Sequence, residues 1–404
     1  MDFIEFGFDD YLMDGIDSMG YKTATPVQEQ VIPPIIAGRD VIAAAQTGTG
    51  KTAAFLLPVL HNILTQTKDD GKIKCMIIVP TRELATQIAQ TLEGLSYFTE
   101  VSSIAVYGGN NGNVFAAERK ALSSGVEIVI CTPGRMIAHL NMGYVQLDEL
   151  RYLVLDEADR MLDMGFYEDI IKIIGFMPKE RQNLMFSATM PPAMRKLANT
   201  ILSNPAEVNI AISRPAEKIK QGVYYVFEEQ KIHLARHILT HHDFGSTIIF
   251  CSSKLSVKRL TEELRRAKLP VDQIHSDLEQ EKREQVLLDF KNKKLKTLVA
   301  TDILSRGIDI EDIELVINYD VPHDGEDYVH RIGRTARAAA TGTAYTFVND
   351  KEQWKFRKIE KLIERTVESM PVPEELGPTP AVREGEPDRA KKKGRNNKFK
   401  RKGN

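Results

Sequence analysis

The chain has 404 residues, 42% of them hydrophobic, which is long enough to form two or three globular domains with separate cores. Its net charge of −2 is unevenly distributed: residues 389–404 contain nine Lys and Arg and no acid, so the remainder carries −11. No apolar run approaches the roughly 20 residues of a membrane helix and the start MDFIEFGFDDY has no leader pattern, so we expect a soluble, cytoplasmic protein.

The first predicted strand, in DVIAAA, leads into the glycine-rich turn QTGTGKT and then into a helical pattern. The glycines allow a tight turn whose N–H groups face a phosphate, at the positive end of the following helix. Lys51 would hold the β- and γ-phosphates of a nucleotide, and the Thr52 hydroxyl would bind Mg²⁺. The strict motif has glycine where this chain has Ala45, so a chance turn with a surface lysine remains the alternative. The candidate nucleotide-binding residues are Ala45, Gln46, Thr47, Gly48, Thr49, Gly50, Lys51 and Thr52.

Further short apolar runs alternate with helical patterns, first at CMIIVP, SSIAVYGG, EIVICTP, YLVLDEAD and NLMFSAT. Strands that are apolar throughout and separated by helices predict a parallel sheet covered on both faces. The series resumes after about Pro215 with STIIFCSS, PVDQIHS, KTLVATD, LVINYD and TGTAYTFV. We therefore predict an α/β protein with two domains, at 31–210 and 218–370. A segment at 1–30 precedes them, and a disordered basic tail at 371–404 follows.

Three carboxylates and an arginine follow the predicted strand YLVL, in the run DEADR. Parallel strands present their carboxyl ends at one edge of the sheet, so Asp156 and Glu157 are expected beside the phosphate loop. There Asp156 would be the metal-side carboxylate and Glu157 the base that prepares the attacking water. The alternative is a helix that starts with solvated acids, and Arg160 and Asp163 are interpreted in that way.

Together with AQTGTGKT and SAT, the run DEAD from Asp156 to Asp159 resembles the motifs of the DEAD-box RNA helicases of superfamily 2. The resemblance extends from about Phe3 to Phe347 and is greatest to the bacterial RhlE-type branch. It implies two tandem RecA-like domains separated by a cleft, with ATP and Mg²⁺ as cofactors. It also implies a monomer that binds RNA through sequence-independent backbone contacts.

The same resemblance assigns roles to residues of the first half. Gln28, in GYKTATPVQ, would read the adenine with both atoms of its amide, and Phe3 would pack against the base. Asp159, Ser187 and Thr189 would couple the nucleotide site to the RNA face. The predicted RNA contacts of three strand-end segments are Pro80, Thr81, Arg82, Gly108, Gly109, Thr132, Pro133, Gly134 and Arg135.

By resemblance, the second half supplies the remaining parts of both sites. Within YVHRIGRTARA, Arg334 and Arg337 would act as arginine fingers on the γ-phosphate. Because the phosphate loop and the fingers lie in different domains, the site would be complete only when the domains close. The other assignments are Gln280, Arg283 and Thr301 to RNA, Asp309 to the ribose, and His330 and Arg331 to bridges with the first domain.

The leading functional hypothesis is an ATP-dependent RNA helicase whose RNA-stimulated ATP hydrolysis drives local unwinding of duplexes. The alternatives are a nucleotide-timed RNA clamp without significant unwinding and a DNA translocase. The basic tail predicts additional salt-sensitive RNA affinity, with a solubilising role as its alternative. Trp354, in EQWKFRKIEKLIERT, could stack a base, but packing of an end helix against the second domain is preferred.

Overall fold

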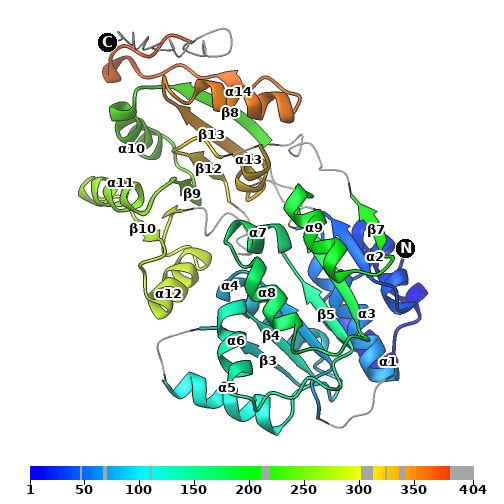
Figure 1. The fold of residues 1–404 in the computed structure, drawn as a ribbon. Coiled ribbons are helices and arrows are strands. Elements are labelled where there is room, and N and C mark those ends of the chain that lie inside the picture. Colours follow the sequence, from blue (N-terminus) through cyan, green and yellow to red (C-terminus); the bar gives the residue numbers. More distant parts are fainter. Residues whose placement is uncertain are drawn as a thin grey trace, which may run out of the picture.

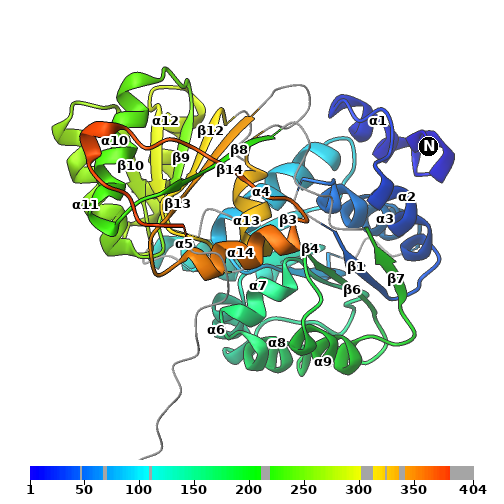
Figure 2. The ribbon, with the colours of Figure 1, turned by 90° about the horizontal axis from the view of Figure 1, so that it is seen from above.

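A computed structural model describes residues 1–45, 48–66, 71–108, 112–210, 219–301, 313–323, 325–335 and 342–382. These residues form two α/β domains, each built on a parallel sheet of seven strands with helices on both faces. Figures 1 and 2 show the domains as two lobes in perpendicular views. Within the described ranges, no helix is both long enough and apolar enough to cross a bilayer.

The sheet of the first domain has the strand order β3-β4-β2-β5-β6-β1-β7. In that order the strands are Ser103–Val106, Ile128–Cys131, Cys75–Ile78, Tyr152–Leu155, Gln182–Ser187, Val41–Ala44 and Ala206–Asn209. Six of them lie in the apolar runs expected from the sequence. The seventh, β7, has the polar sequence AEVN and pairs only with β1 at the sheet edge, which explains why hydrophobicity did not reveal it.

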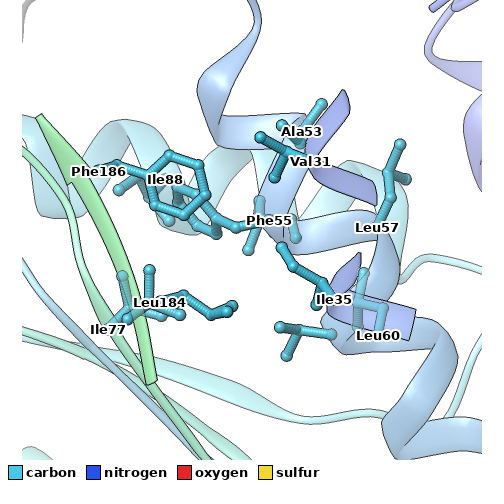
Figure 3. Close-up of a cluster of buried hydrophobic side chains, with 14 of the residues drawn as sticks. Val31, Ile35, Ala53, Phe55, Leu57, Leu60, Ile77, Ile88, Leu184 and Phe186 are labelled. Atoms are coloured by element: carbon cyan, nitrogen blue, oxygen red, sulfur yellow. The ribbon is translucent and has the colours of Figure 1, made fainter. Parts of the chain in front are cut away.

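Helices cover both faces of this sheet, and α2, α3 and α4 enclose the cluster in Figure 3. The rings of Phe55 and Phe186 lie 5.1 Å apart in this cluster, and both side chains are fully buried. A capping box between Thr25 and Gln28 starts α2, with Pro26 in its first turn. The helices are η1 Phe3–Phe6, α1 Asp10–Ser18, α2 Pro26–Ile36, α3 Lys51–Gln66, α4 Arg82–Leu95, α5 Gly112–Ser124, α6 Pro133–Asn141, α7 Ala158–Asp163, α8 Tyr167–Ile174 and α9 Pro192–Ile201.

The sheet of the second domain has the order β10-β11-β9-β12-β13-β8-β14. Its strands are Val271–Ile274, Thr297–Ala300, Thr247–Phe250, Leu315–Asn318, Gly342–Val348, Ile219–Tyr225 and Glu368–Ser369. The strands β8 and β14 were not predicted from the sequence, and β8 pairs with β13 along its whole length. The helices are η2 Glu228–Gln230, α10 Lys231–His241, α11 Lys254–Arg266, α12 Gln280–Lys291, α13 Gly325–Ile332, α14 Gln353–Leu362 and η4 Glu374–Leu376.

The chain continues to pack on the second domain beyond the expected end of the fold at Met370. Val372 and Leu376 contact its hydrophobic core. Gln230 Nε2 donates to the carbonyl of Leu376 at 2.6 Å, and Gln353 Nε2 donates to that of Ala381 at 2.9 Å. The start of the tail at residue 371 was therefore placed too early, because a few apolar contacts and carbonyl acceptors hold a Pro-rich segment without regular structure. Residues 383–404 lie outside the described ranges.

Candidate active site

The first-domain candidates gather at the carboxyl edge of three adjacent strands. Strand β6 lies between β5 and β1, so its end at Ser187 separates the end of β1 from the acidic run after β5. The phosphate-loop turn follows β1 and leads into α3, while Asp156 and Glu157 follow β5 and lead into α7. This arrangement places segments about a hundred residues apart in the sequence at one edge.

Two residues around the start of α2 hold the described part of the phosphate loop. Thr25 Oγ1 donates to the carbonyl of Thr49 at 2.8 Å, and Gln28 Nε2 donates to that of Gly50 at 3.1 Å. Gly50 has a φ of 89°, and a Cβ there would lie 2.6 Å from Gln28 Nε2, so glycine is required. Gln46 and Thr47 fall outside the described residues.

Gln28 and Phe3 make contacts within the first domain that were not predicted from the sequence. Besides binding Gly50, the Gln28 amide accepts from the Thr25 N–H at 2.8 Å, so with respect to the described residues each amide atom keeps one hydrogen or lone pair for a base. Phe3, expected to pack against the adenine, is only 3% exposed. It packs on Phe6 and Tyr21, at ring separations of 6.1 Å in both cases, as part of the first domain's core.

Lys51 and Asp156 are both buried, and their opposite charges interact. Among the described residues, the buried Lys51 Nζ has no hydrogen-bond partner. Burial raises the pKa of Asp156 to about 6, although the positive charge of Lys51 acts in the opposite direction. Leaving a buried ammonium without a hydrogen-bond partner is costly, so this atom indicates a place for an anion. A nucleotide phosphate on Lys51 and Mg²⁺ beside Asp156 fit this donor set, because Mg²⁺ commonly uses one or two carboxylates together with substrate phosphates.

Glu157 has a strained backbone and a buried cationic partner. Its φ of 50° and ψ of 46° lie in the left-handed region, which is unusual for glutamate and is found at constrained functional sites. Arg160 Nη1 lies 3.2 Å from Glu157 Oε2, and the two residues are 7% and 5% exposed. The interpretation of Arg160 as a solvated helix residue was therefore wrong. Its position three residues after Glu157, on the same helical face, was the available signal.

Asp159 connects the acidic run to the end of β6. Its Oδ2 atom accepts from the N–H groups of Ala188 at 3.2 Å and Thr189 at 3.0 Å, and from Thr189 Oγ1 at 3.0 Å. Ser187 Oγ donates to the Thr189 carbonyl at 2.6 Å. The structure thus brings together all three residues assigned to coupling in this domain, and any displacement of the strand end must alter contacts with a buried carboxylate.

The predicted RNA contacts of the first domain lie at the ends of β2, β3 and β4. Thr81 caps α4 by accepting from the Leu84 N–H at 3.3 Å. Arg135 does not present a free guanidinium, because its Nε and Nη2 atoms both lie 2.7 Å from Glu118 Oε2. The described residues from these segments are Pro80, Thr81, Arg82, Gly108, Thr132, Pro133, Gly134 and Arg135, whereas Gly109 lies outside the described ranges.

Arg283, predicted to contact RNA, makes an ion pair between the domains. Its Nη1 atom lies 2.7 Å from Oε1 of Glu83, a residue of α4 in the first domain. The two side chains are 13% and 8% exposed, so the pair is largely shielded from water. Thr301 Oγ1 is buried without a hydrogen-bond partner among the described residues. The side chain of Gln280 and all of Asp309 lie outside the described part of the structure.

The basic residues of α13 and the following turn are buried in the second domain. Arg331 Nη1 donates to the Asp320 carbonyl at 3.1 Å and to Asn318 Oδ1 at 3.3 Å. These contacts lie at the end of β12, and the bridges to the first domain expected of His330 and Arg331 stay a prediction. Arg334 Nε donates to the His330 carbonyl at 3.4 Å, and both residues are at most 5% exposed. Arg337 is outside the described residues.

Comparisons with known proteins agree with this architecture. The family model for DEAD/DEAH box helicases matches residues 25–197, and that for the helicase conserved C-terminal domain matches residues 230–339. The ATP-dependent RNA helicase CshA of Listeria monocytogenes is 41% identical over 92% of this chain and 70% of its own length. The helicase DeaD of Haemophilus influenzae is 38% identical over 93% of this chain and 60% of its own. Assignment to the RhlE-type branch stays a prediction.

Solved structures with RNA and a nucleotide analogue bound share the arrangement of this chain. A point variant of S. cerevisiae Dbp5 bound to RNA and ADP BeF3 gives a TM-score of 0.82, at 30% identity, over 92% of this chain and 95% of that chain. The same Dbp5 variant bound to a variant of Gle1 and IP6 gives 0.74 at equal identity and coverage. Mss116 bound to ssRNA and AMP-PNP gives 0.81, at 30% identity over 93% of this chain and 80% of that one.

Proposed function

This chain belongs to the DEAD-box family and is an ATP-dependent RNA helicase, and we propose that domain closure around RNA completes its hydrolytic site. The observation that carries the proposal is the buried Lys51 ammonium beside Asp156, at the edge where β1, β5 and β6 end. Such a pair suits a triphosphate with its metal. We infer that hydrolysis takes place there.

The residues of the first domain would have separate roles in hydrolysis. Lys51 would hold the β- and γ-phosphates, and Thr52 and Asp156 would hold Mg²⁺, which offsets phosphate charge when bound. Glu157 would orient and deprotonate the attacking water. The Arg160 contact at 3.2 Å to its Oε2 atom would hold the carboxylate in place while the other oxygen accepts from the water. Arg160 therefore acts as a positioning residue.

Closure would bring the second domain's arginines to the γ-phosphate. Support comes from the Dbp5 comparison, because the TM-score of this chain is 0.82 against the RNA and ADP BeF3 complex and 0.74 against the Gle1 complex. Arg334 and Arg337 would supply the finger contacts, a contribution of about 10³ to 10⁵ in rate. Asp159 would transmit the state of the nucleotide site to the end of β6 through Thr189.

RNA would bind across both domains by its sugar-phosphate backbone. The strand-end turns of the first domain provide N–H groups and hydroxyls, and Thr301 provides a buried hydroxyl in the second. Such contacts do not read bases, so we propose sequence-independent binding. Closure over one strand would bend it and separate it from its complement.

Three measurements test the proposal. ATPase rates with single-stranded RNA, with DNA of the same sequence and without nucleic acid should show stimulation by RNA alone. Displacement of a strand from a short RNA duplex should require ATP, which distinguishes a helicase from a nucleotide-timed clamp. Glu157→Gln should bind ATP normally and hydrolyse it at least about 100-fold more slowly. Equal stimulation by DNA, or normal turnover by Glu157→Gln, would contradict the proposal.

A further inference from the structure

The outward face of α14 carries an exposed tryptophan. The packing role expected for Trp354 is filled instead by Phe356 and Ile359, which are at most 1% exposed. Trp354 itself is 41% exposed and is the single tryptophan of the chain. An indole left on the surface in this way gains little from folding, and such residues are enriched where a ligand binds.

Basic residues surround this ring. Lys358 Nζ lies 4.7 Å from the centroid of the Trp354 ring, and Lys361 is exposed one turn further along the same face. Neither lysine makes an ion pair within the described part of the chain. Residues 351–365 contain six basic and three acidic residues, although residues 1–388 as a whole are acidic. The helix is therefore a local positive surface on an acidic body.

Two of the nearby acids are already engaged by the protein. Glu352 lies 3.1 Å from the buried Lys231 Nζ, and Glu360 accepts from the Val367 N–H at 2.9 Å. A pocket of about 550 Å³ adjoins the helix and opens between α14, β8 and β14. Its polar lining has the cations of Lys220, Arg357 and Arg365, the hydroxyls of Tyr225, Thr366 and Ser369, and the carboxylates of Glu360 and Glu368, so the cations outnumber the carboxylates. Hydroxyls and cations in a concave surface next to an exposed indole suit a phosphate-bearing ligand.

This surface is distant from the predicted RNA contacts of the second domain. Those contacts belong to α12 and β11, near the β10 end of the sheet, whereas α14 borders β8 and β14 at the other end. Five strand spacings separate β10 from β8, roughly 24 Å at about 4.8 Å per strand. Figure 1 shows α12 and α14 well separated on the second domain. One RNA strand could reach both places only if it extended beyond the cleft.

We propose that this α14 face, formed by Trp354, Lys358 and Lys361 with the adjoining pocket, binds a single-stranded RNA segment outside the interdomain cleft. A base stacks on Trp354, and the lysines and the pocket take the neighbouring phosphates. The chain's own residues 389–404 are an unsuitable occupant, since they are basic and would be repelled. RNA is the complementary polyanion that this helicase already binds.

Tryptophan fluorescence, excited selectively over tyrosine, tests the proposal directly, because all of the tryptophan emission comes from Trp354. Titration of the full chain with a long single-stranded RNA, in the absence of nucleotide, should change the emission saturably, with an effect that weakens as salt increases. Lys358→Glu with Lys361→Glu keeps the reporter and should weaken this binding. The matched control is Lys172→Glu with Lys179→Glu, an equal charge change at exposed lysines of the first domain, and it should titrate like the unaltered protein.

ATPase assays separate this surface from the helicase site. For Trp354→Ala, the concentration of long RNA needed for half-maximal stimulation should rise about fivefold, the low end of the effect of losing one stacked base. With an oligonucleotide that fills only the cleft, the concentration needed for half-maximal stimulation of Trp354→Ala should equal the concentration needed by the Lys172→Glu, Lys179→Glu control. Emission that is unchanged by long RNA, or identical titrations for the two double variants, would overturn the proposal while RNA-stimulated hydrolysis still reported on the helicase site.

Discussion

The ion pair between Glu83 and Arg283 offers a direct way to measure the free energy of domain closure. Its two atoms lie 2.7 Å apart, although the residues are 200 positions apart and belong to different domains. Glu83→Ala and Arg283→Ala each remove one partner. The charge exchange Glu83→Arg with Arg283→Glu restores an opposite pair in reverse orientation. If the pair stabilises the closed arrangement, both single variants should weaken RNA-stimulated hydrolysis and the exchange should recover part of the loss.

The expected size of the effect follows from geometry and burial. Two unit charges 4 Å apart gain about 4 kcal/mol at an effective dielectric constant of 20, near a protein surface. Desolvation and lost side-chain freedom offset part of this gain when the side chains are mostly buried. We therefore expect a coupling free energy of about 2 kcal/mol, which corresponds to roughly 30-fold in the closed population.

The assay is the RNA concentration for half-maximal ATPase stimulation, measured for the four proteins of the cycle. ATP binding without RNA should stay unchanged, since neither residue belongs to the phosphate loop or the acidic run after β5. If Arg283 instead contacts an RNA phosphate, Glu83→Ala should have little effect and the exchange should be worse than either single variant. That result, or a coupling free energy near zero, would refute the role of the pair in closure.

Further predictions concern the nucleotide site, the coupling contacts and the core. Because burial raises the pKa of Asp156 to about 6, lowering the pH below that value should protonate it, and MgATP affinity measured by titration should fall about tenfold per pH unit. Asp159→Asn should leave MgATP affinity within about threefold, because the Asp159 carboxylate is occupied by the end of β6, but should reduce RNA-stimulated ATPase by at least about 10-fold, since hydrogen bonds to a buried carboxylate are lost. Phe55→Ala should lower the free energy of unfolding by about 3–5 kcal/mol in denaturant titrations, as the ring is fully buried against Phe186.

For each of these predictions, one result would contradict the physical reason given. An affinity step near pH 6 that survives in Asp156→Asn would belong to another group. Unchanged RNA stimulation in Asp159→Asn would mean that its contacts with the end of β6 only support the fold. A loss below about 1 kcal/mol for Phe55→Ala would mean that the cluster in Figure 3 collapses around the gap.

Much of the fold could be predicted because it depends on local patterns. Six strands of the first domain lie in short apolar runs, and the glycine turn after β1 requires residues with a positive φ, such as Gly48 and Gly50. The strands β7 and β8 could not be predicted in this way. The first is polar at a sheet edge, and the second follows a polar connector, so their assignment depends on partners far away in the chain.

By itself, the sequence determined the alternation of strands and helices, the phosphate-loop chemistry and the acidic run after β5, since each resides within a few consecutive residues. Only the tertiary structure decided which charged groups are partners. It paired Arg283 with Glu83, Arg135 with Glu118 and Arg160 with Glu157, and left Trp354 exposed. A side chain's partner and exposure depend on how separate elements pack, and the spacing of motifs along the chain does not predict that packing.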